Sequence, residues 1–194
     1  MKEGWEIKKL GEVIQKTETV DPSKKSDTEF FYVDVSSVNN QGFFIESIST
    51  VKGKDAPSRA RKLIRTNDVI FATVRPTLKR IAIIEEYLDE QVCSTGYFVL
   101  RAKEIIHYKL LFYYLLTEGF ICKMESLQKG ASYPAVTDGE VRNQTIYYPK
   151  SLPEQQQIVS ILDEAFAAIA KAKANAEQNL RNAKELFESY LQGV

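Results

Sequence analysis

The feature that most constrains this chain is a heptad repeat in its last quarter. Ten positions follow one another in alternating steps of four and three residues, and apolar or small side chains fill all but one of them. They are Ile158, Leu162, Ala165, Ile169, Ala172, Ala176, Asn179, Ala183, Leu186 and Tyr190, which we call the seam. This spacing is typical of a coiled coil. It predicts a single helix within residues 151–192, in which about 39 residues span roughly 58 Å at ~1.5 Å per residue.

The ends of this predicted helix carry start and stop signals. Ser151 and Glu154 have the spacing of a capping box, Pro153 lies in the first turn, and Gly193 follows the last seam residue. A small domain is about as wide as this helix is long, so we expect the helix to project and to pair with a partner. The alternative is a surface helix that lies on its own domain. Asn179 favours one register of a paired helix, because a buried amide opposite an apolar side chain goes unpaired.

Length and composition indicate one ordinary domain with an extension. The chain has 194 residues, of which 44% are hydrophobic and 11% aromatic, enough for a real core. We therefore expect two parts, residues 1–150 and the helix at 151–194. Their fold class is α+β: a mixed, mostly antiparallel sheet domain with packed helices, followed by one long C-terminal coiled-coil helix.

The expected elements of the first part can be placed by their patterns. Alternating and β-branched residues indicate strands, and a helical period follows them. Strands are expected at 30–35, from 43, at 68–74, 81–84, 97–100 and 145–149, one helical segment at 105–127, and an extended loop at 129–136. The basic hexapeptide 75–80 lies between two expected strands, so we predict that it forms the turn of a hairpin.

The formal net charge is zero, but its distribution is uneven. Residues 52–80 hold nine Lys and Arg against two Asp, a local net charge of +7. A local positive patch on a neutral protein is the pattern of a polyanion-binding face. The plainer interpretation is a well-solvated surface hairpin.

Catalytic and cofactor motifs are missing from the sequence. His107 is the only histidine, and no GxGxxG, GxxxxGK[ST] or GxSxG motif occurs. Cys93 and Cys122 belong to no CxxC pair, so zinc is unsupported and reduced thiols are expected. The longest apolar run, 110–116, is far shorter than the roughly 20 residues that span a bilayer. We therefore expect a cytoplasmic binding protein with no catalytic or metal site and no membrane segment.

Double-stranded DNA is the polyanion that the basic stretch fits best. Arg and Lys contact phosphates, while Arg and polar side chains at base edges discriminate between sequences. A second polar and basic loop at 129–133 is expected to converge on the same face. The predicted DNA-binding residues are Arg59, Arg61, Lys62, Arg65, Thr73, Arg75, Thr77, Lys79, Arg80, Lys129, Ser132 and Tyr133.

Four stretches of the chain resemble the DNA specificity subunits of type I restriction-modification systems. The segment Trp5–Val13 looks like the family's repeat start, and 68–80 and 93–101 are similar to its target recognition domain. The segment from Gly130-Ala-Ser-Tyr-Pro-Ala-Val136 through Tyr148-Pro149 to Asp163 resembles the start of its long helix. The spacing Pro…Glu-Gln…Ile…Leu-Asp is the most distinctive part, and the four stretches cover nearly the whole chain.

The resemblance implies an architecture and partners. Family members usually contain two target recognition domains, each followed by a long helix, and the two helices pair antiparallel. This chain has one of each, so it resembles half a subunit that restores the symmetry by homodimerising through its helix. The resemblance also implies methyltransferase (M) and restriction (R) subunits as partners. S-adenosylmethionine, ATP and Mg are expected on those partners and no cofactor on this chain.

Two other classes of function stay open from the residues alone. One is a coiled-coil interaction scaffold whose basic loop binds an acidic partner. The other is a modification enzyme, which the missing motifs disfavour.

Overall fold

A computed structural model of the chain describes residues 2–192, with side chains to Leu191. The chain divides after Gln156 into two compact units. We call them the globular unit (2–156) and the helical unit (157–192), and each is described by itself. The division follows the first turn of the last helix, α5 (Leu152–Gln192), so this turn belongs to the globular unit.

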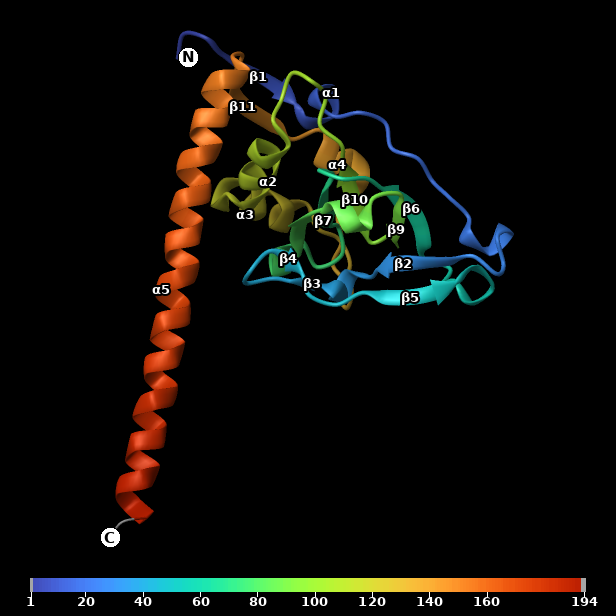
Figure 1. The fold of residues 1–194 in the computed structure, drawn as a ribbon. Helices are drawn as coiled ribbons and strands as arrows, with labels where there is room; N and C mark the ends of the chain where they lie inside the picture. Colours follow the sequence, from blue (N-terminus) through green and yellow to red (C-terminus); the bar gives the residue numbers. More distant parts are fainter. Residues whose placement is uncertain (1, 193–194) are drawn as a thin grey trace. The chain divides into compact units, whose positions relative to one another are not determined.

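A three-stranded antiparallel sheet forms the centre of the globular unit, with the strand order β10-β7-β8. Its middle strand β7 (Val69–Ala72) is buried throughout, and it pairs with β8 (Ile81–Ile83) and β10 (Tyr97–Leu100) (Figure 1). The β7–β8 pair is the predicted hairpin, and the basic hexapeptide forms its turn. The core residues of β7 are Val, Ile, Phe and Ala, as expected for a strand that is covered on both faces.

A second, four-stranded sheet has the order β5-β2-β9-β6. It consists of β2 (Glu29–Val33), β5 (Ser49–Lys52), β6 (Ala60–Ile64) and β9 (Gln91–Ser94). The pair β2–β9 is parallel, whereas β2–β5 and β6–β9 are antiparallel. The expected α+β fold with a mixed, mostly antiparallel sheet is therefore confirmed.

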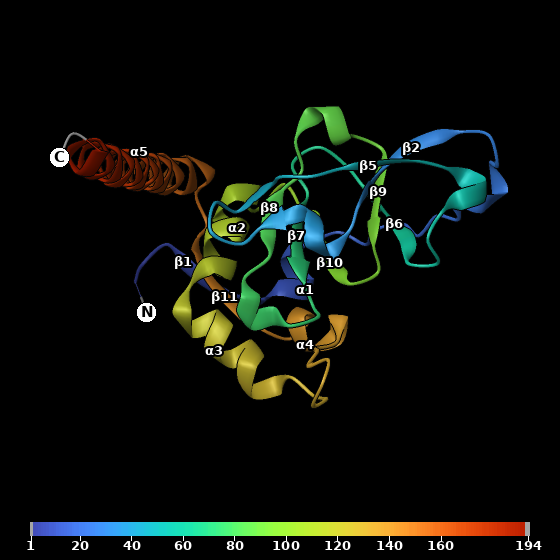
Figure 2. The same cartoon turned by 90° about the horizontal axis from the view of Figure 1, so that it is seen from below.

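Two helices cover the central sheet where one helical segment was expected. They are α2 (Tyr108–Leu116), which packs on β7 and β8, and α3 (Glu118–Leu127), as Figure 2 shows. Thr117 separates them, because its hydroxyl donates to the Tyr114 carbonyl (2.7 Å) and accepts from the Phe120 amide (3.3 Å). This side chain therefore ends one helix and caps the next.

The two ends of the globular unit pair with each other. Strand β1 (Trp5–Lys9) runs antiparallel to β11 (Thr145–Pro149), and the Trp5 and Tyr147 rings lie 4.8 Å apart. The expected last strand matches β11, but its pairing with the first strand was not predicted. The remaining short elements are α1 (Leu10–Val13), β3 (Val38–Asn39), β4 (Phe44–Ile45) and α4 (Asp138–Arg142).

The first turn of α5 is tied to the globular unit by a buried amide. Gln155 is 0% exposed; its Oε1 accepts from the His107 amide (2.7 Å) and its Nε2 donates to the Ile105 and Pro149 carbonyls (3.0 and 2.8 Å). His107 caps α2 through Nδ1, which accepts from the backbone of the second following residue. Glu154, expected in a capping box, accepts a hydrogen bond from Trp5 Nε1 (3.1 Å).

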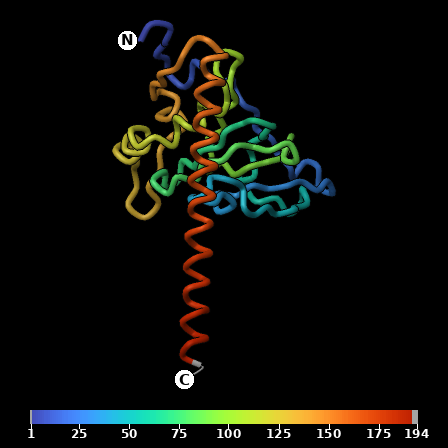
Figure 3. The backbone as a smooth tube through the Cα atoms, turned by 60° about the vertical axis from the view of Figure 1, so that its left-hand side comes forward, coloured from blue at the N-terminus to red at the C-terminus, as the bar shows by residue number. Residues whose placement is uncertain are grey.

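The predicted long helix is confirmed, and it runs without a break to Gln192 (Figure 3). The expected stop residue, Gly193, lies outside the described residues. A lone helix has no neighbour within its own unit, and its large apolar side chains are exposed: Ile169 by 63%, Leu186 by 73% and Tyr190 by 76%. None of the described helices is long and apolar enough to cross a membrane.

Candidate nucleic-acid interface

The turn between β7 and β8 is conformationally unusual. A 3-10 turn, η4 (Pro76–Leu78), is flanked by Arg75 at φ 49° and Lys79 at φ 52°, both in the left-handed region. Residues other than glycine rarely adopt this region, and such residues cluster at functional sites. The Arg75 amide donates to the Pro134 carbonyl (2.7 Å), so the turn is held against the loop 129–136.

The loop 129–136 presents an aromatic ring beside that turn. The Arg75 guanidinium lies 5.3 Å from the centre of the Tyr133 ring, and its Nη2 is 3.4 Å from the Ser132 carbonyl oxygen. The Tyr133 side chain is 73% exposed. Paired backbone hydrogen bonds between Lys129 and Ala135, each 2.9 Å, close the base of the loop. The two basic loops therefore converge, as the sequence analysis expected.

A third segment reaches the same place through backbone hydrogen bonds. The Thr73 amide donates to the Gly96 carbonyl (2.8 Å) in the β9–β10 turn, and the Thr95 amide donates to the Arg59 carbonyl (2.8 Å). Arg59 is exposed, and its side chain has no hydrogen bond or ion pair among the described residues. We call Arg59, Arg75, Ser132 and Tyr133 the turn face. Thr77, which is exposed, and Lys79 extend it along the hairpin turn.

Three of the predicted DNA-binding cations are neutralised by nearby carboxylates. Arg61 Nη1 lies 2.8 Å from Asp21, and Arg65 Nη2 lies 3.3 Å from Glu18. Lys62 Nζ lies 2.9 Å from Asp138 and also donates to the Tyr97 carbonyl (2.6 Å). Each of these cations already forms an ion pair within the fold. They therefore differ from the cations of the turn face, although they belong to the same basic stretch.

Two further predicted residues hold the fold together, and a third stays exposed. Arg80 Nη1 donates to three carbonyls of the segment 35–38, at 3.0 to 3.1 Å. Thr73 is 5% exposed and its hydroxyl donates to the Gly96 carbonyl (3.0 Å). Lys129 Nζ lies 3.3 Å from Glu140, but its side chain is 82% exposed and stays accessible to solvent.

A buried ion pair was missed by the sequence analysis. Asp68 is 1% exposed, and both of its oxygens accept from Arg101, Nε to Oδ1 and Nη2 to Oδ2 at 2.9 Å each. Arg101 Nη1 reaches Glu18 (2.7 Å). The Arg101 hydrogen bond is the main cause of the lowered pKa of Glu18, and Asp68 is the main cause of the raised pKa of Arg101. The partners are 33 residues apart, so no local pattern reveals the pair.

The thiols differ in their surroundings. Cys93 is fully buried in the core, and this burial raises the pKa of its thiol. Cys122 lies exposed on α3. Among the described residues, no three side chains of the metal-binding types cluster together.

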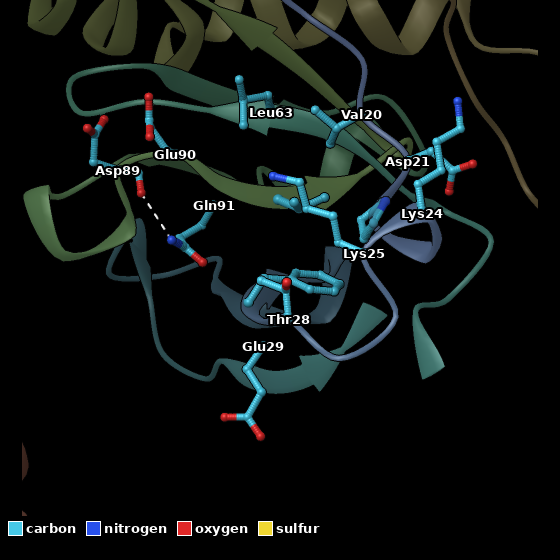
Figure 4. A pocket seen from close by; sticks show the side chains of 13 residues that line it. Val20, Asp21, Lys24, Lys25, Thr28, Glu29, Leu63, Asp89, Glu90 and Gln91 are labelled. Atoms are coloured by element: carbon cyan, nitrogen blue, oxygen red, sulfur yellow. Dashed lines mark hydrogen bonds between the residues drawn. The ribbon is translucent and has the colours of Figure 1, made fainter. Parts of the chain in front are cut away.

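One pocket of the globular unit lies away from the turn face (Figure 4). It measures about 520 Å³ and is lined by apolar side chains and by charges of both signs. The lining includes Lys24 and Lys25 as well as Asp21 and Asp89, and Gln91 Nε2 donates to the Asp89 carbonyl (3.1 Å). This mixed lining favours no class of ligand. The turn face, with unpaired cations and an exposed aromatic ring, is the better candidate site.

The solved structures most similar to this chain include two with substantial sequence identity. The HsdS subunit from Thermoanaerobacter tengcongensis is 41% identical, with a TM-score of 0.82 over 89% of this chain and 44% of that one. A structure titled for complex assembly and conformational transition of the type I R-M system is 38% identical, with a TM-score of 0.89 over 97% of this chain and 49% of that one. The S subunit from M. genitalium, at 12% identity and a TM-score of 0.52, shares the fold alone.

Sequence comparison gives the same family. The chain is 27% identical to the type I restriction enzyme HindI specificity subunit of Haemophilus influenzae over 166 residues, which is 82% of this chain and 35% of that protein. It therefore spans half or less of the length of these relatives. Residues 2–178 match the family described as type I restriction modification DNA specificity domain. The chain belongs to this family of type I restriction-modification specificity subunits, with one target recognition domain.

Proposed function

We propose that the globular unit reads a short half-site of double-stranded DNA through the turn face. The proposal rests on the conformation and surroundings of Arg75. Its backbone is held in a left-handed conformation by the loop 129–136, and its guanidinium lies against the exposed Tyr133 ring. A stacked guanidinium has lost much of its rotamer freedom before DNA arrives, so less entropy is lost on binding.

The chemistry of the turn face suits both kinds of DNA contact. Arginine is the side chain that most often contacts guanine specifically, through O6 and N7 in the major groove, and a hairpin turn can enter that groove. We assign this role to Arg75. Arg59 and Lys79 are the accessible cations for phosphates, which fix the position of the protein without reading sequence. Arg61, Lys62 and Arg65 contribute less, because carboxylates already neutralise them.

The helical unit joins two copies of the chain, so that the dimer recognises two DNA half-sites. Large apolar side chains of the seam are exposed, and two copies joined through them would bring together two recognition domains related by a two-fold axis. Within this proposal the chain is a non-catalytic subunit that acts in the cytoplasm. Methyltransferase (M) and restriction (R) subunits dock on it, and they carry the S-adenosylmethionine, ATP and Mg.

Equilibrium binding to duplexes tests the DNA-reading function. Duplexes selected from a random pool should bind more tightly than scrambled duplexes, and affinity should fall steeply with salt. Arg75→Ala should remove the preference for the selected sequence, whereas Arg61→Ala, which removes the same charge from an existing ion pair, should keep it. A protein that binds all duplexes alike, with or without Arg75, would be an interaction scaffold and not a specificity subunit.

A further inference from the structure

The first turn of α5 is held in the globular unit by one buried side chain. Gln155 is 0% exposed, and its amide contacts three backbone groups. Its Oε1 accepts from the His107 amide (2.7 Å), and its Nε2 donates to the Ile105 carbonyl (3.0 Å) and to the Pro149 carbonyl (2.8 Å). The side chain therefore joins the start of α5 both to the last residue of β11 and to the segment that leads into α2.

The three partners of Gln155 require the chemistry of an amide. One N–H and two carbonyls need an acceptor and two donors at the end of a single side chain, which Asn and Gln carry, and Asn is shorter by one methylene. Glutamate would turn a carboxylate towards two carbonyls. Methionine, which has a similar length, would leave all three backbone groups buried without a partner. Because the three bonds run to two different segments, a tilt of the first turn stretches at least one of them.

The neighbouring contact of the first turn is weaker. Glu154 Oε1 accepts from Trp5 Nε1 (3.1 Å) and lies 3.3 Å from Lys2 Nζ. The side chains of Lys2 and Glu154 are 66% and 35% exposed, so water competes for this carboxylate and salt screens it. Water does not reach the Gln155 amide, and Gln155 is therefore the firmer of the two attachments.

A small change at the first turn has a large effect at the far end of α5. The helix runs without a break from Leu152 to Gln192, so roughly 55 Å of it lies beyond Gln155 at ~1.5 Å per residue. One base pair of DNA rises by about 3.4 Å. A tilt of the first turn by about 4° therefore displaces the far end of the helix by roughly one base-pair step.

We propose that Gln155 is a positioning residue that sets the length of the gap between the two DNA half-sites. The proposal rests on the proposed function, in which two copies joined through α5 read two half-sites. A dimer that rejects a gap one base pair too long needs the first turn of each α5 held constant to within a few degrees. Gln155 touches no DNA in this role and acts through the helix that it holds.

Competition binding with the full-length protein tests this role. The probes are duplexes that carry the selected half-site once, or as an inverted repeat whose gap is changed in steps of one base pair. Wild-type protein should prefer one gap by about tenfold or more, and Gln155→Met should reduce this preference to about threefold or less, with affinity for the single half-site within about twofold of wild type. Gln157→Met, the same substitution at an exposed position, is the matched control and should keep the wild-type preference.

Hydrogen exchange of the wild-type protein needs no substitution, so it decides the question even if Gln155→Met does not fold. The His107 amide donates to Gln155 Oε1 and should exchange as slowly as the amides of β7 in the core. Exchange faster than in β7 by about a hundredfold or more would show that the first turn detaches by itself, and would overturn the proposal.

The other outcomes of the binding experiment also overturn the proposal. An unchanged gap preference in Gln155→Met means that other contacts hold the turn. An equal loss of affinity for the single half-site means that Gln155 only stabilises the fold. Wild-type protein that reads half-sites at any gap contradicts the proposal but keeps the proposed DNA-reading function, whereas wild-type protein with no preference for any half-site removes that function. The two failures are therefore distinguishable.

Discussion

The two units of this chain differ in how much of their apolar surface is buried within the chain. The globular unit buries its apolar residues internally: β7 is covered on both faces, and Val69, Ile70 and Phe71 are each 0% exposed. The helical unit has an apolar face of similar chemistry and no element of its own to cover it. The difference teaches that contacts within the chain specify the globular unit, whereas under the proposed function the helical unit depends on contacts with a second copy.

The largest expected effect falls on the helical unit. Leu162→Asp places a charge in the seam of each helix of the proposed two-fold pair, and an unpaired buried charge is strongly unfavourable. We expect dimer affinity to fall by about 1000-fold or more, about 4 kcal/mol, measured by sedimentation equilibrium. Ala167→Asp, which adds the same charge off the seam, should leave the dimer intact. Equal effects of the two substitutions would mean that the seam is not the interface.

The next largest effect falls on the globular unit. Arg101→Ala leaves Asp68 buried without its bidentate partner, and breaking such a pair costs about 3–5 kcal/mol of unfolding free energy. Denaturant unfolding measures the loss. Arg65→Ala breaks a pair between half-exposed side chains and should cost less than about 1 kcal/mol. If Arg101→Ala weakened the dimer instead, the independence of the two units would be wrong.

A smaller effect is expected for Arg75→Ala, which should change DNA binding without changing the stability of the fold. Arg75→Ala should weaken binding to a selected duplex by about 1–3 kcal/mol and relax the preference at one base pair, with the unfolding free energy almost unchanged. Competition binding with single-base variants of the duplex measures this. An equal loss for every variant would reduce Arg75 to a phosphate contact.

The smallest effect concerns two neighbouring arginines of the same basic stretch. Arg59→Ala should weaken all duplexes alike and reduce the salt slope of binding by about one, because a free cation releases counterions on binding. Arg61→Ala should change the slope much less, since Asp21 already pairs with its guanidinium. Binding isotherms at four salt concentrations compare the two. Identical slopes would show that the ion pair opens on DNA.

Local patterns predicted the elements that depend on local interactions. The heptad steps gave the long helix, the β-branched runs at 68–74 and 81–84 gave the hairpin, and the strand at 145–149 matches β11 residue for residue. What failed depends on contacts distant in sequence. The pairing of β1 with β11 joins residues about 140 positions apart, and no single-strand pattern encodes a partner. The break at Thr117 was missed because the apolar period continues across it.

The sequence identified the basic stretch that contains the candidate site, but not the surroundings of its side chains. Charge counting located the basic stretch, but it treated Arg80 and Arg75 alike. Only the fold shows that Arg80 is held by three carbonyls, whereas Arg75 lies on an exposed ring. Sequence reports the charge of a side chain, and tertiary structure decides whether that charge is already satisfied.

Selection of bound duplexes from a random pool tests the central claim most directly, namely that two copies of one reading unit are joined by a helix. The helix is roughly 60 Å long at ~1.5 Å per residue, a length comparable with one to two turns of DNA at ~34 Å each. The account predicts an inverted repeat of a short half-site with an unspecified gap, and loss of the second half-site in Leu162→Asp. A single continuous site, unchanged in that variant, would contradict it.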